Sequence, residues 1–142
     1  MKRFSINMTL AVAALTLTAG TISAQTMKAE IPFAFRVGRQ LMQPGSYRVS
    51  ILSGTSSTRI VRLTGDSVVR TTLASQTSHN DVPSAWTAEA SPKLRFTCDE
   101  GPCTLTSLWV GSGSPLEFRS ERAKNGEPRI AEVTLRPDRS VD

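Results

Sequence analysis

The sequence of 142 residues is poor in the side chains from which metal and redox sites are built. It contains one histidine, two cysteines, one tyrosine and two tryptophans. One histidine and one cysteine pair cannot supply a clustered zinc site, a haem attachment motif or an iron–sulfur frame. A phosphate-cradling glycine loop and a dinucleotide-binding fingerprint are also missing from the sequence. We therefore expect no metal site and no cofactor.

Long apolar runs are equally scarce, and the one sizeable stretch lies near the start. Two basic residues open the chain, an apolar segment spans 8–19, and small residues run up to Ala24. These are the three parts of a secretory signal peptide. A bilayer span needs about 20 apolar residues, so the segment is too short for a membrane anchor. We expect a signal peptide over 1–24, cut after Ala24 or alternatively after Ser23. The protein would then be exported, periplasmic or extracellular, and without a transmembrane span after cleavage.

Charge of one sign is not in large excess. The chain has 17 basic and 12 acidic residues, and removal of residues 1–24 takes away two basic ones, which leaves a net charge of +3. This surplus is too small to indicate nucleic-acid binding, and an exported protein does not meet the genome. Nucleic acid is therefore not an expected partner.

Short alternating segments fill the rest of the chain. Apolar residues occupy every second position in 47–51, 93–98 and 131–135, a period that predicts half-buried strands. Further strand candidates are 29–37, 59–63, 68–74 and 104–110. Evenly spaced prolines beside Gly, Ser or Asp punctuate the second half, as is typical of all-β sandwiches and barrels. We predict a mainly β protein, with a single antiparallel β-sandwich or open barrel over 25–142.

One short helix is allowed near residues 115–124. Ser114 is a capping residue, a proline follows it, and Glu117 stands three residues after the cap. The competing interpretation is a strand that places Leu116 and Phe118 on one face. Both interpretations remain open on the sequence alone.

Cys98 and Cys103 form the most specific local motif. Two strand-like runs flank a four-residue loop with Asp, Gly and Pro, so the two side chains can face each other across a hairpin. Thiol oxidoreductases usually carry two residues between their cysteines, and a metal site would need further ligands. In an exported protein we therefore expect a structural disulfide.

His79 is the residue on which catalysis could be built. It lies in a polar loop two residues before Asp81, and serines are plentiful. An exported hydrolase that uses His79 with a Ser and an Asp partner is therefore the alternative function. No G-x-S-x-G elbow supports it, so we expect a solvated loop histidine, no catalytic residue and no enzyme.

Arginines are concentrated in the first half of the chain. Six lie between positions 36 and 70, against Asp66 as the only acidic residue there. Strand alternation predicts that Arg48, Arg62 and Arg70 point away from their neighbouring valines and share an outer face. Guanidinium groups bind carboxylates and phosphates, so this face could bind an anionic envelope polymer or another envelope protein. The alternative is a solvated face whose arginines pair with the acidic second half.

The few large aromatic residues are expected to pack rather than to bind sugars. Trp109 shares strand parity with Leu105, which points it toward the core. Trp86 follows the loop at Pro83 and is the better candidate for exposure.

Two stretches resemble an uncharacterised family of small exported β-rich proteins found in environmental bacteria, acidobacteria especially. The chain reads AEIPFAFRVG over 29–38 and LMQPGSY over 41–47, where the family shows IPFxFxVG and then LPAGxYxV. The segments 94–110 and 119–122 are similar to a strand pair that ends in Trp and to an arginine–glutamate tail. The chain departs from the family in its cysteine pair and in a further strand-like run after the tail. The resemblance implies an exported β-domain and carries no activity over.

These observations together favour a non-catalytic binding or structural component of the cell envelope.

Overall fold

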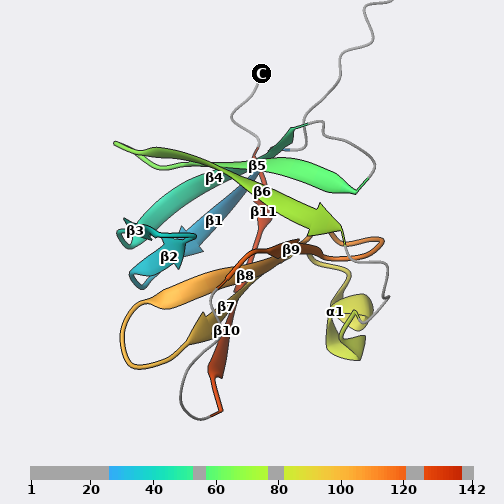
Figure 1. Ribbon diagram of the computed structural model, residues 1–142. Coiled ribbons are helices and arrows are strands. Elements are labelled where there is room, and N and C mark those ends of the chain that lie inside the picture. Colours follow the sequence, from blue (N-terminus) through green and yellow to red (C-terminus); the bar gives the residue numbers. More distant parts are fainter. Residues whose placement is uncertain (1–25, 53–56, 77–81, 121–126, 139–142) are drawn as a thin grey trace, which may run out of the picture.

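The computed structural model describes residues 26–52, 57–76, 82–120 and 127–138. Within these ranges eleven strands form one continuous sheet, and one short helix packs beside it (Figure 1). The elements in chain order are β1 (Thr26–Ile31), β2 (Phe35–Val37), β3 (Gln40–Met42), β4 (Gly45–Leu52), β5 (Thr58–Thr64), β6 (Val69–Gln76), α1 (Ser84–Glu89), β7 (Lys93–Cys98), β8 (Cys103–Trp109), β9 (Leu116–Phe118), β10 (Arg129–Thr134) and β11 (Arg136–Pro137). The prediction of a mainly β chain is confirmed.

The sheet folds back on itself into two layers. Its hydrogen-bonded order is β10-β7-β8-β9-β6-β5-β4-β1-β11, and the short strand β9 links β6 of one layer to β8 of the other. The two ends of this path, β10 and β11, are joined through buried Leu135, whose amide donates to the carbonyl of Pro92 over 2.8 Å. The result is an open, sandwich-like sheet and not a closed barrel.

The β2–β3 hairpin connects the layers at one end, on the left in Figure 1. β2 follows β1 in the chain but pairs in parallel with β8, at Phe35 opposite Cys103. The prediction of one strand over 29–37 is therefore wrong at its centre, where Pro32 to Ala34 separate β1 from β2. Proline has no N–H to donate to a ladder, so a break at this position follows from the sequence.

The core lies between the two layers. Alternating residues of both layers fill it, and the rings of Phe35, Tyr47 and Phe96 meet edge to face at centroid distances of 5.2 Å and 5.4 Å. The buried cluster consists of Met27, Ala29, Ile31, Phe35, Val37, Met42, Tyr47, Val49, Val61, Leu63, Ala74, Leu94, Phe96, Leu105, Leu108, Leu116, Phe118 and Leu135. Burial of these side chains is the main force that holds the layers together.

The helix allowed over 115–124 is not formed where the structure describes that segment. Leu116 and Phe118 are buried and Glu117 is exposed, so the strand period applies, and β9 pairs with both β6 and β8. Residues 121–124 lie outside the described ranges. Two ladders and two buried apolar side chains favour the strand over one capping signal, because a helix here would bury a thin apolar face.

The helix of the structure is α1, in a region expected to begin as a loop. It starts after Pro83, whose carbonyl accepts from the amide of Trp86 over 2.9 Å, and it ends at Ala90 with φ 53°. Six residues are too few for a stable isolated helix. α1 therefore depends on its packing against the sheet, and Trp86 is the residue that it buries.

Candidate functional site

The outer face of β4, β5 and β6 is built from three rows of directly paired residues. Cross-strand partners point to the same side of a sheet, so each row lies side by side on this face. The rows are Leu52–Ile60–Leu73, Ser50–Arg62–Thr71 and Arg48–Thr64–Val69. We call these nine residues the outer face.

Arg48 and Arg62 share the outer face, as the alternation predicted. Arg48 is engaged, because its Nε lies 2.5 Å from Oδ2 of Asp138, whose side chain is only 4% exposed. This ion pair connects the basic first half to the acidic second half, as the solvated-face alternative expected. Arg62 is exposed and forms no ion pair within the described residues. Arg62 is therefore the arginine of the outer face whose charge is not paired within the described residues.

Arg70 does not share the outer face, and the prediction that it does is wrong. The turn between β5 and β6 pairs Thr64 with Val69, so the next pair is Leu63 with Arg70. Leu63 belongs to the core, which puts Arg70 on the inward side and leaves Val69 59% exposed on the outer face. The sequence-based assignment failed because Val69 is apolar yet exposed, so apolar character gave the wrong parity for β6.

Arg70 is half-buried at the end of the sheet where the β2–β3 hairpin lies. Its Nε is buried without a hydrogen-bond partner in the described part of the chain. Its Nη2 lies 3.8 Å from the point where a Cβ would stand on Gly38, a residue with φ +60° in the hairpin turn. The guanidinium therefore reaches across from β6 to the backbone of that turn.

Large apolar side chains are exposed on the outer face. Leu73 is 62% exposed and Val69 is 59% exposed, and half-buried Leu52 and Ile60 lie in the same row as Leu73. Arg62 stands in the row between Leu73 and Val69. A mixed apolar and arginine-bearing surface is the composition found at protein interfaces.

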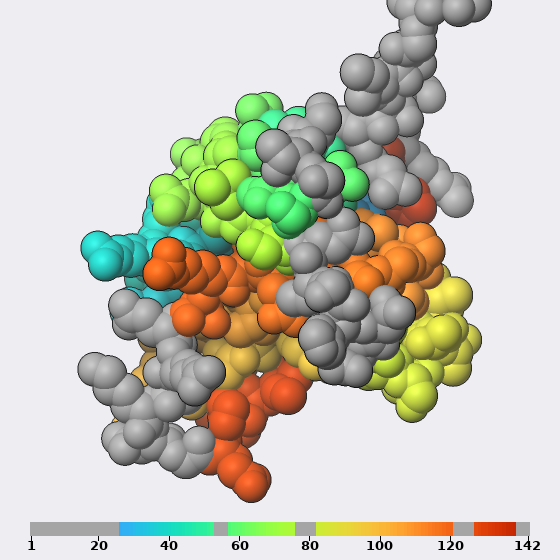
Figure 2. All heavy atoms as spheres, turned by 45° about the vertical axis from the view of Figure 1, so that its right-hand side comes forward, coloured from blue at the N-terminus to red at the C-terminus, as the bar shows by residue number. Residues whose placement is uncertain are grey.

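A second cluster lies on the other layer, where α1 packs outside the main core. Trp86 of α1 stacks on Trp109 of β8 at a centroid distance of 5.8 Å and an interplanar angle of 26°. The Arg95 guanidinium lies 4.4 Å from the centroid of the Trp86 ring. Figure 2 shows α1 (yellow) separated from β5 and β6 (green) by the residues around β9 (orange). This cluster is therefore distinct from the outer face.

Trp86, the better candidate for exposure of the two tryptophans, is only 2% exposed, which agrees with the expectation that the large aromatic residues pack. The prediction that Trp109 points toward the core is wrong, because the irregular ladder between β7 and β8 places Leu105 and Leu108 in the core and Trp109 under α1. Trp109 is buried there, and its Nε1 donates to the carbonyl of Gly113 over 3.0 Å. Both indoles are occupied by packing and offer no open ring for a sugar. The signal that was missed is the start of α1 at Pro83, which places Trp86 on the sheet-facing side of a helix.

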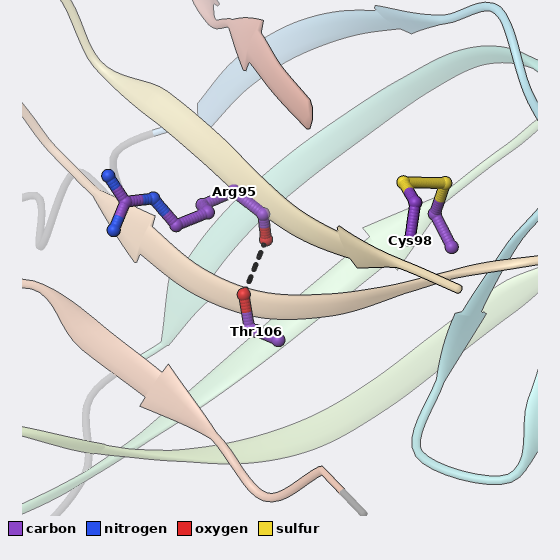
Figure 3. The surroundings of a disulfide bond; sticks show 4 residues. Arg95, Cys98 and Thr106 are labelled. Carbon is purple, nitrogen blue, oxygen red and sulfur yellow. Dashed lines mark hydrogen bonds between the residues drawn. A yellow bond between two sulfur atoms is a disulfide. The ribbon is translucent and has the colours of Figure 1, made fainter. Parts of the chain in front are cut away.

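The cysteine pair forms the predicted disulfide between Cys98 and Cys103. It joins the facing ends of β7 and β8, and Figure 3 shows it beside the ladder with the Arg95 side chain directed away from it. A bulge interrupts this ladder between Arg95 and Phe96. The hydroxyl of Thr106 donates to the carbonyl of Arg95 over 3.1 Å, which satisfies an acceptor beside the bulge (Figure 3). The disulfide therefore links the two strands of this hairpin.

The loop that carries His79 and Asp81 lies outside the described residues, so the hydrolase alternative gains no geometric support. Within the described ranges no three His, Cys, Asp or Glu side chains gather as metal ligands. No described helix is long and apolar enough to cross a bilayer.

Comparisons with protein-family models, with curated proteins and with solved structures find no match for this chain.

Proposed function

We propose that the protein is an exported, non-catalytic binding component of the cell envelope that docks through its outer face. The observation that carries this proposal is the position of Arg62 between two exposed apolar residues, Val69 and Leu73. The partner that suits this face is an acidic, partly apolar segment of another envelope protein. An anionic envelope polymer is the other candidate, and the experiment below separates the two.

Apolar exposure supports a protein partner over a purely ionic polymer. Covering a leucine or valine side chain contributes about 1.5–3 kcal/mol, and a polyanion without apolar groups cannot supply this contact. Arg62 would add specificity, because its planar guanidinium can bind a carboxylate in bidentate fashion. Arginine is also among the residues enriched at the energetic centres of interfaces.

Export is part of the proposal and rests on three features. The apolar segment at 8–19 suits a signal peptide, and the disulfide suits an oxidising compartment. The resemblance to small exported β-rich proteins points the same way and adds no activity.

The test is retention of the purified mature protein on its native envelope fraction, with variants of the outer face. We expect Arg62→Ser with Leu73→Ser to reduce retention by at least tenfold. Matched controls are Leu41→Ser in β3 and Arg129→Ser in β10, which alter one exposed leucine and one exposed arginine on strands that do not contribute to this face. Retention unchanged by the double variant, or reduced equally by the controls, contradicts the proposal.

Treatment of the envelope separates the two partner classes. Prior digestion with a protease should abolish retention if the partner is a protein. Retention that survives the protease but is lost in 0.5 M salt would assign the face to an anionic polymer instead.

A further inference from the structure

We propose that Arg70 and the turn of the β2–β3 hairpin form a binding site for one compact anionic group, a carboxylate or a phosphate. This site is separate from the outer face and does not depend on its function. Arg70 belongs to the inward side of β6, opposite Leu63, whereas Arg62 points outward. The two arginines therefore serve different surfaces.

The first step of the argument is the charge of Arg70. A guanidinium is ionised at any ordinary pH, and taking it partly out of water costs free energy unless an anion or hydrogen bonds compensate. Within the described residues Arg70 has no ion pair, and its Nε has no hydrogen-bond partner. The Nε–H of Arg70 is therefore available to donate a hydrogen bond to a bound anion.

Nearby acidic residues do not fill this role. Asp66 stands four residues before Arg70 in the chain, in the turn between β5 and β6, and is exposed. It forms no ion pair with Arg70. The compensating anion is therefore absent from the described chain around Arg70.

The hairpin turn supplies the second half of the site. The last ladder pair of the hairpin is Val37 with Gln40, so Gly38 and Arg39 form a two-residue turn outside the ladder. Backbone amides of such a turn are free to donate to an anion. Gly38 also has no side chain between its backbone and Arg70, whose Nη2 is 3.8 Å from the empty Cβ position.

Further positive charge lies on the same hairpin. Arg36 of β2 and Arg39 of the turn are both exposed and form no ion pair in the described structure. The hairpin over 35–42 thus adds two exposed arginines and no acidic residue to the charge of Arg70. Their summed field draws anions to this end of the sheet, and the planar fork of Arg70 fits a carboxylate or phosphate group.

The experiment uses NMR spectroscopy on the mature protein, titrated at fixed ionic strength with two probes. Trigalacturonate tests the carboxylate and inorganic phosphate tests the phosphate. We expect the largest amide shifts at Gly38 and Arg39, with a shift of the Arg70 Nε–H signal. The probe that saturates at the lower concentration shows whether the site prefers a carboxylate or a phosphate. Shifts confined to other arginines, or none with either probe, overturn the proposal without any need for a variant.

Substitutions then test the role of Arg70 itself. Arg70→Gln should weaken binding of the better probe by at least tenfold, and Arg70→Lys should weaken it less, because the ammonium keeps the charge but lacks the fork. Arg129→Gln in β10, an exposed arginine of the other layer, is the matched control and should leave binding unchanged. Equal weakening in Arg70→Gln and Arg129→Gln would show non-specific charge attraction and would refute the site.

The outcome is independent of the proposed docking face. Arg62→Ser with Leu73→Ser should leave the shifts at Gly38 intact while it reduces envelope retention. A failure of envelope retention therefore does not count against the Arg70 site. A failure of the probes to bind at Arg70 likewise does not count against docking through the outer face.

Discussion

Replacement of Trp86 by alanine is the sharpest test of how α1 is held on the sheet. The indole is 2% exposed, stacks on Trp109, contacts the guanidinium of Arg95, and is the buried residue of a six-residue helix. Without it α1 would have little apolar surface left to pack. We therefore expect Trp86→Ala to detach the helix as well as to remove one side chain.

The magnitude follows from the contacts. Truncation of a buried Trp to Ala costs about 3–5 kcal/mol, and this includes the lost stack on Trp109 and the lost contact with the guanidinium of Arg95. We expect about 3 kcal/mol, the lower end, because the cluster lies outside the main core and water can fill the space after α1 leaves. For a domain of this size each kcal/mol lowers Tm by roughly 3–5 °C, so Tm should fall by roughly 9–15 °C.

The assay is urea denaturation followed by far-UV circular dichroism, with near-UV spectra to report fixed aromatic packing. Trp86→Phe keeps a ring over Trp109 and should lose less than half as much stability. A double-mutant cycle with Arg95→Met should give a coupling of about 1 kcal/mol between the two residues. A loss below about 1 kcal/mol for Trp86→Ala would refute the reasoning, since α1 would then contribute nothing measurable to the fold.

Three further predictions concern other parts of the chain. Cys98→Ser should lower the free energy of unfolding by about 2 kcal/mol, since the closed loop is short, and a loss above about 4 kcal/mol would show that the disulfide does more than fix the hairpin. Burial first, and then the charge of Asp66, raise the pKa of Tyr47 above its usual value of 10.0. As the pH rises, the unfolded chain loses the Tyr47 hydroxyl proton before the folded protein does. The contribution of the protonated hydroxyl to the free energy of unfolding is therefore complete below pH 10 and is lost as the pH rises through the raised pKa. Urea titrations of Tyr47→Phe should lack this alkaline loss of stability. Mass spectrometry of the protein from the native envelope should find Gln25 at the N-terminus, and an intact residue 1 there would exclude cleavage.

Strand positions were largely predictable because, in most of this sheet, the apolar residues of the alternating pattern are also the buried ones. The segment 93–98 is β7 to the residue, and 47–51 and 59–63 fall inside β4 and β5. In these strands one face meets the core and the other meets water, so the side-chain pattern records the register. The cysteine pair was predictable for a similar reason, because turn residues between two strands fix which positions face each other.

The predictions from the sequence are wrong where apolar character and burial do not agree. Val69 is apolar but exposed and Arg70 is polar but half-buried, so the pattern of β6 misassigns both. The stack of Trp86 on Trp109 was not predicted because the two residues are 23 positions apart and on different elements. Propensity within a short window carries no information on such a contact, which only the tertiary fold creates.

The pairing of β1 with β11 has a consequence for the time at which the sheet can be completed. Met27 and Lys28 pair with Pro137 and Arg136, so the first and the last described strands are neighbours. Contacts between such distant parts of a chain form slowly, because the entropy of closing the intervening loop must be lost first. A chain threaded through a membrane from its N-terminus would hold β1 with one unpaired edge until residues 136 and 137 had crossed. In such a chain the ladders among β1, β4, β5 and β6 could form early, and only the edge closed by β11 would have to wait for the C-terminal strand.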